Sequence, residues 1–328
     1  SNLHSGQFSA ACGVFAPGWH SGGNEWLLAC EPTAYVVQRQ KLSREGSVWK
    51  SRREPGGSEF MSSSDTWFRP VDITAGPQQS VLIVDMARAV IEHPDFMPTE
   101  LKSRPDQRDG TELGRIWKVA EKSAAPNTVS LQTTEDAIKW LNSQSAWQRA
   151  SASQYLLEKG KAGLKPLSDL VLDDQSGPAA RSRAAWLLNN NGALSNQHAI
   201  VLMKSDDERL RALGIRFSQG RPALLKNMLA MAADTDPLVV RGVAAEAGSA
   251  SDFAPSRVQA LAKIAEQWSS KDDWIRLTLA SADRSLLKAL SHKIASKKQM
   301  DVLLLKHLVE RIGIESPVDS VVIVLAAG

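Results

Sequence analysis

The sequence predicts a multidomain β + α chain, in which a partial β-propeller of about two blades is followed by an α-α solenoid. Strand-sized segments separated by turn-rich stretches predict the first part, and a change to helical periodicity near residue 133 predicts the second. An arginine that recurs after the change predicts repeated helix pairs. We expect domains at 1–120 and 133–312, a linker at 121–132, and the start of a further segment at 313–328.

Size and composition fit two folding units. The chain has 328 residues and is 43% hydrophobic, which is enough for ordinary cores. Its 39 basic and 36 acidic residues give a formal net charge of +3 without long runs of either sign, so no nucleic-acid partner is indicated. No apolar run reaches the roughly 18 residues that a membrane span needs. Because the chain closes on an apolar strand at 321–325, we expect an interior piece of a longer protein.

The first part contains apolar or alternating segments of strand length, at 25–30, 34–39, 71–74, 81–85 and 115–119. Turn-rich stretches lie between them, as at 16–24, 54–58 and 75–79. This rhythm is typical of antiparallel meanders, and a propeller is the best candidate. A propeller hides its strand edges only when the ring is complete, so further blades are expected upstream.

Cys12 and Cys30 are the only cysteines, and they flank a predicted hairpin with strands at 9–15 and 25–30. If the register places them opposite each other, a cross-strand disulfide is feasible. The alternative is two buried free thiols.

The second part contains five self-similar stretches, SAWQRASA, GPAARSRA, DERLRALG, PLVVRGVA and DDWIRLTL. They align on Arg149, Arg181, Arg211, Arg241 and Arg276, at spacings of 32, 30, 30 and 35 residues. Each arginine lies near the start of a predicted second helix, and an amphipathic segment precedes it. Paired helices at this period predict a solenoid.

This pattern resembles HEAT repeats, in which an acidic residue at a turn and a following arginine satisfy helix ends along the array. Asp207 with Arg211, Asp236 with Arg241 and Asp272 with Arg276 fit it best. The first two repeats lack the acidic residue at that place, and an unclassified array of helical hairpins is the alternative.

The most specific stretch is 59–119, which contains SSDTWFRPVD, GPQQSVLIVDM, IEHPDFMPTE and DGTELGRIWKV. Together with the earlier SAACG and ACEP, it resembles the terminal propeller segment of the planctomycete and verrucomicrobial (PVC-type) membrane-bound dehydrogenase domain or haem-binding proteins. The order of propeller then HEAT array agrees with that family, and the resemblance covers most of the chain.

The resemblance implies an exported protein, in the periplasm or at the cell surface. Its propeller is similar to glucose/sorbosone dehydrogenases, quinoproteins that bind pyrroloquinoline quinone (PQQ) with calcium. A c-type cytochrome domain usually follows the helical repeats in that family. The present chain contains no CxxCH, so covalent haem would belong to a domain outside it. The catalytic base and the calcium ligands would come mainly from blades outside this chain.

Arg69 lies where the sugar dehydrogenase blade carries an arginine near the quinone, and a guanidinium there could pair with a cofactor carboxylate. The competing interpretation is that Arg69 closes the blade through Asp65 or Asp72. His93, with Glu92 and Asp95, could supply metal ligands or proton-transfer groups. A loop histidine bonded to backbone is the simpler account.

Two functions compete. The leading hypothesis is a fragment of a quinoprotein-like sugar (aldose) dehydrogenase that passes electrons to a cytochrome, with the helical array as spacer or docking surface. The alternative is a non-catalytic scaffold whose propeller binds carbohydrate or protein and whose solenoid holds a protein partner.

Overall fold

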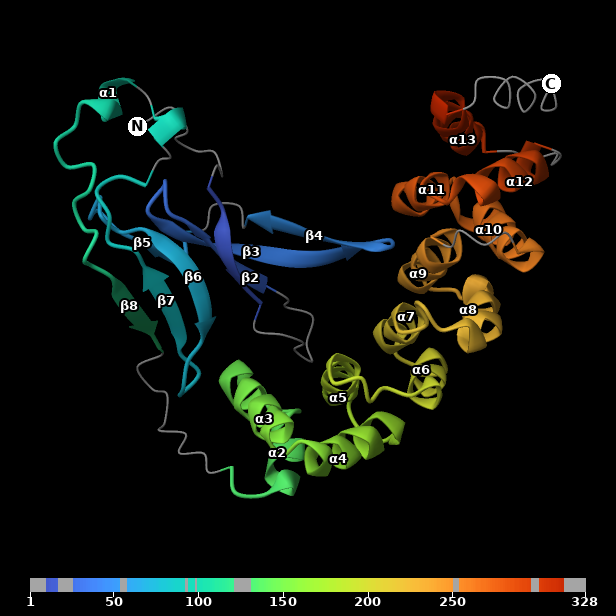
Figure 1. Cartoon of the computed structure of the whole chain (residues 1–328), viewed down its shortest axis with the longest axis horizontal. Helices are drawn as coiled ribbons and strands as arrows, with labels where there is room; N and C mark the ends of the chain where they lie inside the picture. Colours follow the sequence, from blue (N-terminus) through green and yellow to red (C-terminus); the bar gives the residue numbers. More distant parts are fainter. Residues whose placement is uncertain are drawn as a thin grey trace. The chain divides into compact units, whose positions relative to one another are not determined.

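The computed structural model describes residues 10–16, 26–53, 58–91, 94–97, 99–120, 131–249, 254–295 and 301–315 (Figure 1). Its contacts divide the chain into two compact units. Unit 1 comprises Ser1–Ser43 and Trp49–Glu158, and unit 2 comprises Arg44–Val48 and Lys159–Gly328. The strands come first and the main helices follow, so the mixed class with β before α is confirmed. The sheets of the described residues do not close into a barrel or a propeller.

The first sheet has the strand order β1-β2-β3-β4, with the short β5 paired to β3. Its strands are β1 (Cys12–Phe15), β2 (Trp26–Glu31), β3 (Val36–Glu45), β4 (Val48–Arg53) and β5 (Met61–Ser62). β2 runs antiparallel to both β1 and β3. The last four residues of β2 are buried, which explains its apolar sequence WLLACE.

The second sheet is a meander of β6 (Pro70–Ala75), β7 (Val81–Asp85) and β8 (Arg115–Val119). Both pairs of strands are antiparallel, as the turn-rich spacing predicted. β1 and β2 contact β6, and the two sheets share a core of Leu28, Cys30, Val37, Phe68, Ile73, Val81 and Ile83. Between β7 and β8 lie a 3-10 turn (Pro94–Phe96) and the short α1 (Thr99–Lys102).

The turn between β6 and β7 is formed by Pro77, Gln78, Gln79 and Ser80. The Ser80 N–H donates to the Pro77 carbonyl, and the Gly76 N–H donates to the Ser80 carbonyl. Gln78 and Gln79 both have positive φ, at 59° and 55°. Two such residues in a row are the geometry of a tight hairpin turn that Asn-Gly ordinarily fills.

The helices α2 to α13 follow the sheets along the chain. They are α2 (Thr134–Trp140), α3 (Ala146–Glu158), α4 (Lys161–Leu172), α5 (Pro178–Asn190), α6 (Asn196–Met203), α7 (Glu208–Arg216), α8 (Leu225–Ala230), α9 (Pro237–Gly248), α10 (Pro255–Trp268), α11 (Asp273–Ala280), α12 (Arg284–Ala295) and α13 (Val302–Glu315). By contacts, α2 and α3 belong to unit 1, because that unit extends to Glu158. The predicted domain boundary near residue 133 therefore differs from the contact boundary. The predicted linker falls mostly on residues 121–130, outside the described residues.

Within unit 2 the helices form two rows. α5, α7, α9, α11 and α13 contact one another in succession, and α4, α6, α8, α10 and α12 do the same. Helices of the two rows also pack on each other, as α4 does on α5 and α6 on α7. A continuous apolar core runs between the rows, with Ile215, Val243, Leu261, Leu279 and Leu308 among its members. Paired helices stacked in this way bury a stripe that no single pair could bury alone.

The recurring arginines lie in the first turns of their helices, as predicted: Arg149 in α3, Arg181 in α5, Arg211 in α7, Arg241 in α9 and Arg276 in α11. In the described part of the chain, no helix is long and apolar enough to cross a membrane. The strand predicted at 321–325 lies outside the described residues.

Candidate functional site

The two cysteines face each other across the β1–β2 pair. Cys12 and Cys30 are directly opposite in the register, and both are free thiols. The Cys12 thiol lies 3.8 Å from the Pro70 carbonyl oxygen. Burial raises the pKa of the Cys30 thiol to about 12, with smaller contributions from Cys12 and Asp72. Both thiols are therefore protonated and weakly nucleophilic at neutral pH. The register meets the condition for a disulfide, which stays a prediction.

Arg69 is 6% exposed, and three of its nitrogens donate to backbone carbonyls. Nε donates to Arg88 (3.0 Å), Nη1 to Pro32 (2.9 Å) and Nη2 to Ala89 (2.9 Å). The guanidinium also packs on the ring of Tyr35, 4.5 Å from its centroid. This side chain ties three backbone segments together and does not offer a two-pronged face to a cofactor carboxylate, so the geometry does not fit the predicted quinone contact.

Asp85, at the end of β7, is the charged group that sequence reasoning missed. It is 1% exposed. Its Oδ1 accepts from the N–H groups of Arg69 (2.8 Å) and Ala87 (2.9 Å). Its Oδ2 accepts from Arg115 Nε (2.8 Å) and Trp117 Nε1 (2.9 Å). Burial raises the pKa of Asp85, but these four donors outweigh that effect and the pKa lies below its usual value.

Arg115 carries the network of Asp85 to the surface. Its Nη1 donates to Asp65 Oδ2 at 2.8 Å, so Asp65 pairs with Arg115 and not with Arg69. Asp72 instead accepts from the Ile73 N–H. A shallow depression of about 450 Å³ lies beside this pair, lined by Asp65, Trp67, Ala87, Leu113, Gly114 and Arg115. The sequence did contain a signal for this ion pair. Asp85 ends one predicted strand and Arg115 begins the next, and antiparallel pairing of the two strands sets these residues opposite each other.

The predicted loop site at Glu92 and His93 lies outside the described residues. Asp95, which was grouped with them, is exposed in the 3-10 turn. In the parts of the chain that the structure describes, no three His, Cys, Asp or Glu side chains are grouped so that they could hold a metal ion.

Unit 2 carries a series of aspartates at the starts of helices. Asp207, Asp236 and Asp272 are the N-caps of α7, α9 and α11, and each accepts from backbone N–H groups of its helix. Since α7, α9 and α11 are neighbours in one row, these carboxylates repeat along the row. We call Glu208, Asp236 and Asp272, the carboxylates at these helix starts that contact Arg44 or Ser47, the N-cap carboxylates.

The repeated arginines satisfy carbonyl groups just before their own helices. Arg149 Nη1 donates to Ser143 and Gln144, and Arg276 Nη1 donates to Ser269. Arg211 Nη1 likewise donates to Ser205 and Asp206. The predicted role of these arginines at helix ends is therefore visible in three repeats.

The acidic partner of Arg211 is different from the predicted one. Its guanidinium forms a two-pronged ion pair with Asp234, just before α9, at 2.8 and 3.0 Å. Asp207, the expected partner, caps α7 and pairs with Arg209. The ion pair thus links one repeat to the next, because the Arg211 side chain extends toward the following turn.

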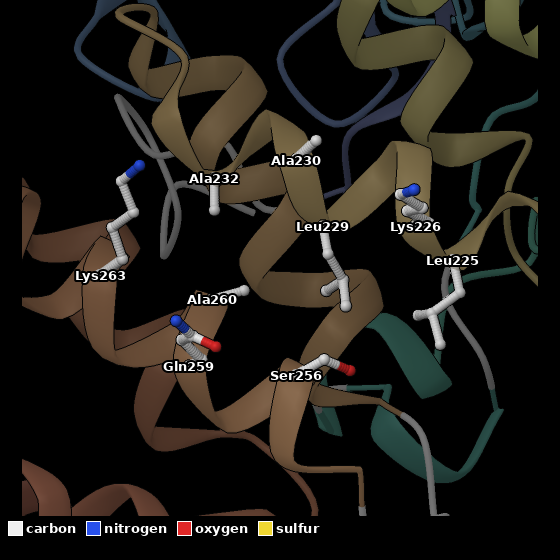
Figure 2. A pocket seen from close by; sticks show the side chains of 9 residues that line it. All are labelled: Leu225, Lys226, Leu229, Ala230, Ala232, Ser256, Gln259, Ala260 and Lys263. Atoms are coloured by element: carbon white, nitrogen blue, oxygen red, sulfur yellow. The ribbon is translucent and has the colours of Figure 1, made fainter.

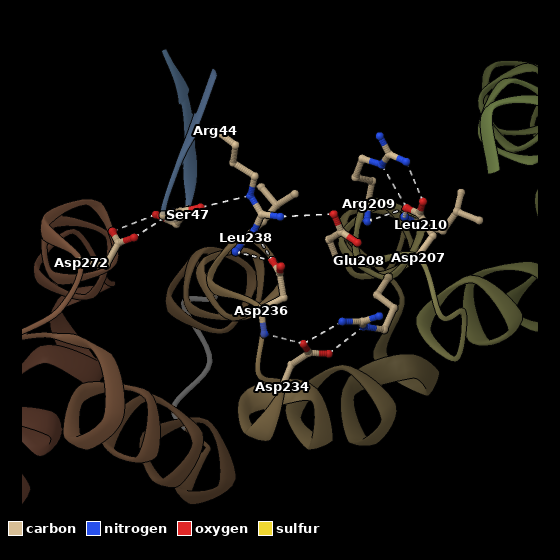
Figure 3. A network of polar contacts seen from close by, with 12 residues as sticks. Arg44, Ser47, Asp207, Glu208, Arg209, Leu210, Asp234, Asp236, Leu238 and Asp272 are labelled. Carbon is tan, nitrogen blue, oxygen red and sulfur yellow. Dashed lines mark hydrogen bonds and ion pairs between the residues drawn. The ribbon is translucent and has the colours of Figure 1, made fainter. Parts of the chain in front are cut away.

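Arg44–Val48, which belongs to unit 2 by contacts, is bound by the N-cap carboxylates (Figure 3). The Arg44 guanidinium pairs with Asp236 and, at 3.3 Å, with Glu208. Ser47 donates its N–H to Asp272 Oδ2 (2.8 Å) and its hydroxyl to Asp272 Oδ1 (2.9 Å). The tip of the β3–β4 hairpin therefore engages the first turns of three successive helices of the row.

Gly46 is required by this arrangement. Its φ is +58°, and a Cβ there would meet the Asp272 carboxylate. Burial raises the pKa of Asp272, but hydrogen bonds from the N–H groups of Ile275, Ser47 and Trp274 and from the Ser47 hydroxyl lower it below its usual value. Asp272 is thus an anion at neutral pH, and it accepts hydrogen bonds from both the backbone N–H and the hydroxyl of Ser47. The arrangement recognises a guanidinium together with a serine.

Comparison with known proteins bears on the N-terminal part. Residues 1–123 match the family model described as a domain of unknown function (DUF7133). No curated protein and no solved structure matches the chain. The matched segment contains Arg69, Asp85 and both cysteines, whereas the helices that carry the N-cap carboxylates lie beyond it.

Proposed function

We propose that this chain is a non-catalytic binding scaffold, whose HEAT-like solenoid recognises basic hairpin turns of protein partners through the N-cap carboxylates. The observation that carries the proposal is the engagement of Arg44 by Asp236 and Glu208 and of Ser47 by Asp272. Glu208 and Asp236 pair with a cation and Asp272 accepts from a serine, while backbone N–H groups of the helices hold the two aspartates in place.

The HEAT-like interpretation is supported by the two rows of helices, by the recurring arginines and by the ion pair between Arg211 and Asp234 of successive repeats. Solenoids of this kind repeat the same surface along the row, which allows one hairpin tip to contact several repeats. The two antiparallel sheets are proposed to be the last blades of a propeller, on the basis of their meander topology and the family resemblance.

The test is a binding measurement on the full chain with a fluorescein-labelled peptide of residues 40–50. In the variant Arg44→Ala/Ser47→Ala the protein's own segment no longer competes with the peptide for the N-cap carboxylates. We therefore expect the peptide to bind this variant at least about tenfold more tightly than it binds the unaltered chain. Equal binding to the two proteins would contradict the proposal.

A matched pair of variants locates the site in that background. Asp236→Asn/Asp272→Asn removes two charges while asparagine still caps the helices, and we expect the gain to be lost. Asp207→Asn removes a charge at the start of α7 that is not among the N-cap carboxylates, because Asp207 accepts from Arg209 and Leu210, and we expect it to leave binding unchanged. Equal effects of the two changes would mean that the attraction is general.

A second candidate rests on the resemblance of residues 59–119 and on the order of β part then helical part. The chain is then part of an exported sugar (aldose) dehydrogenase in the periplasm or at the cell surface, with PQQ and calcium in the complete protein and electrons passed to a c-type cytochrome domain. Since each of the three Arg69 nitrogens already donates to a backbone carbonyl, this candidate places the quinone contacts mainly on residues outside this chain.

Quinone-dependent dye reduction by the complete parent protein with aldoses tests this second candidate. A scaffold should show none with any aldose. In an active protein, Arg69→Ala should reduce thermal stability and leave quinone affinity of the folded fraction unchanged. A loss of quinone affinity at unchanged stability would restore the predicted cofactor contact of Arg69.

A further inference from the structure

A groove lies between α8 and α10 of unit 2, in the row of helices opposite to the one that carries the N-cap carboxylates (Figure 2). Its volume is about 410 Å³, and it is open to solvent along its length. None of the site residues predicted from the sequence lies in this part of the chain.

The walls of the groove are two helix faces. α8 contributes Leu225 and Leu229, which are half-buried and four residues apart, so they lie on one face. α10 contributes Gln259 and Ala260, with Ala260 buried at the centre of its stripe. A small residue there leaves room that a larger aliphatic side chain would fill. The floor is therefore apolar and receptive to an inserted side chain.

The rim of the groove is cationic. Lys226 of α8 and Lys263 of α10 are both exposed, and Figure 2 shows them on either side of Leu229. The other polar lining residues are Ser256 and Gln259, and none of the nine residues that line the groove is acidic. An apolar floor between two ammonium groups is complementary to an apolar side chain flanked by carboxylates.

We propose that this groove binds an acidic amphipathic helix of a partner protein, with a leucine-type side chain on Leu229 and Ala260 and carboxylates paired with Lys226 and Lys263. A helix laid between two helices places its residues at i, i+3 and i+4 along such a groove. The groove adds a second binding site to the proposed scaffold and stands on its own observations, because it takes acidic ligands whereas the N-cap carboxylates take basic ones.

The test uses the full chain and a fluorescein-labelled designed peptide with leucine at every third or fourth position and glutamate between them. A peptide of the same composition in scrambled order is the control ligand. Fluorescence anisotropy should show saturable binding of the amphipathic peptide. Lys226→Glu/Lys263→Glu should weaken it by about tenfold or more, since two attractive pairs become repulsive.

The matched control is Lys161→Glu/Lys165→Glu, which makes the same charge change at exposed positions of α4 in the same row. It should leave binding unchanged. A second variant, Ala230→Trp, fills the groove without changing charge and should also weaken binding, with far-ultraviolet circular dichroism confirming the helices. Absence of binding, equal binding of the scrambled peptide, or equal weakening by the α4 control would overturn the proposal. The basic peptide that tests the N-cap carboxylates should bind all of these variants alike.

Discussion

The two compact units use buried charge in different ways. In unit 1, Asp85 and Arg69 form a single network whose partners come from several strands and loops and which occurs once. In unit 2, aspartates and arginines occupy equivalent places in successive helices, and the ion pair of Arg211 with Asp234 joins neighbours.

The difference predicts how far the loss of one charged residue should destabilise the surrounding structure. A unique buried carboxylate with four donors cannot be replaced by a neighbour, so its loss should affect the whole sheet. In a repeated array each repeat contacts only its neighbours, so the loss of one ion pair should act locally. Asp236, with 19% of its side chain exposed, is also nearer to solvent than Asp85, whose side chain is fully buried.

The largest effect is expected for Asp85→Ala. It leaves Arg115 Nε, Trp117 Nε1 and the N–H groups of Arg69 and Ala87 without their acceptor. We expect a loss of about 3 to 5 kcal/mol in the free energy of unfolding of unit 1, measured by urea titration. Asp65→Ala, which removes the exposed partner of the same arginine, should cost less than about 1 kcal/mol. Similar costs would show that Asp85 is not the centre of the network.

Arg211→Ala should have the next largest effect, about 1 to 3 kcal/mol, because a two-pronged ion pair and two carbonyl hydrogen bonds are lost. Hydrogen exchange should accelerate in α7 and α9 while β7 and β8 keep their protection. Arg209→Ala is the control, since its pair with Asp207 lies within one turn. Faster exchange throughout the chain would contradict the local character of unit 2.

Asp207→Ala should destabilise α7 by about 1 kcal/mol at neutral pH, through loss of the cap. Burial raises the pKa of Asp207, but the Arg209 side chain and two N–H groups outweigh burial and lower it. The stability that Asp207 contributes is thus present above the unfolded-state pKa of about 4 and is lost as the pH falls through the folded-state pKa. Urea titrations of variant and parent should converge at acid pH, and a constant difference would contradict the ionic contribution.

The smallest effect is a stabilisation of unit 1 in Gln78→Asn/Gln79→Gly. Both residues have positive φ, which glycine and asparagine adopt at lower cost. We expect a gain of about 0.4 to 1 kcal/mol in the free energy of unfolding. The control Gln132→Gly lies outside the turn and should show no gain in stability. A melting temperature that does not rise for the turn variant would contradict backbone strain at Gln78 and Gln79.

The strands with strong patterns were predictable. β7 and β8 begin and end where VLIVD and RIWKV predicted, since buried and exposed residues alternate in β7. β4 and β5 were not predicted, because VWKSRR is polar and β5 is only two residues long. Their strand conformation comes from pairing with β3, across a two-residue turn for β4 and at long range for β5, and the apolar pattern of the segments does not contain this.

The sequence by itself determined the change from β to α and the aspartates at the helix starts, because periodicity and capping act within a few residues. The register that sets Cys12 opposite Cys30 came from the structure. Only the tertiary structure decided which partner each charge takes. Arg69 donates to carbonyls of Pro32, Arg88 and Ala89, and Arg211 pairs with Asp234 of the next repeat. The physical reason is that a long charged side chain takes the acceptor that folding brings within about 3 Å, and distant segments supply most of those acceptors.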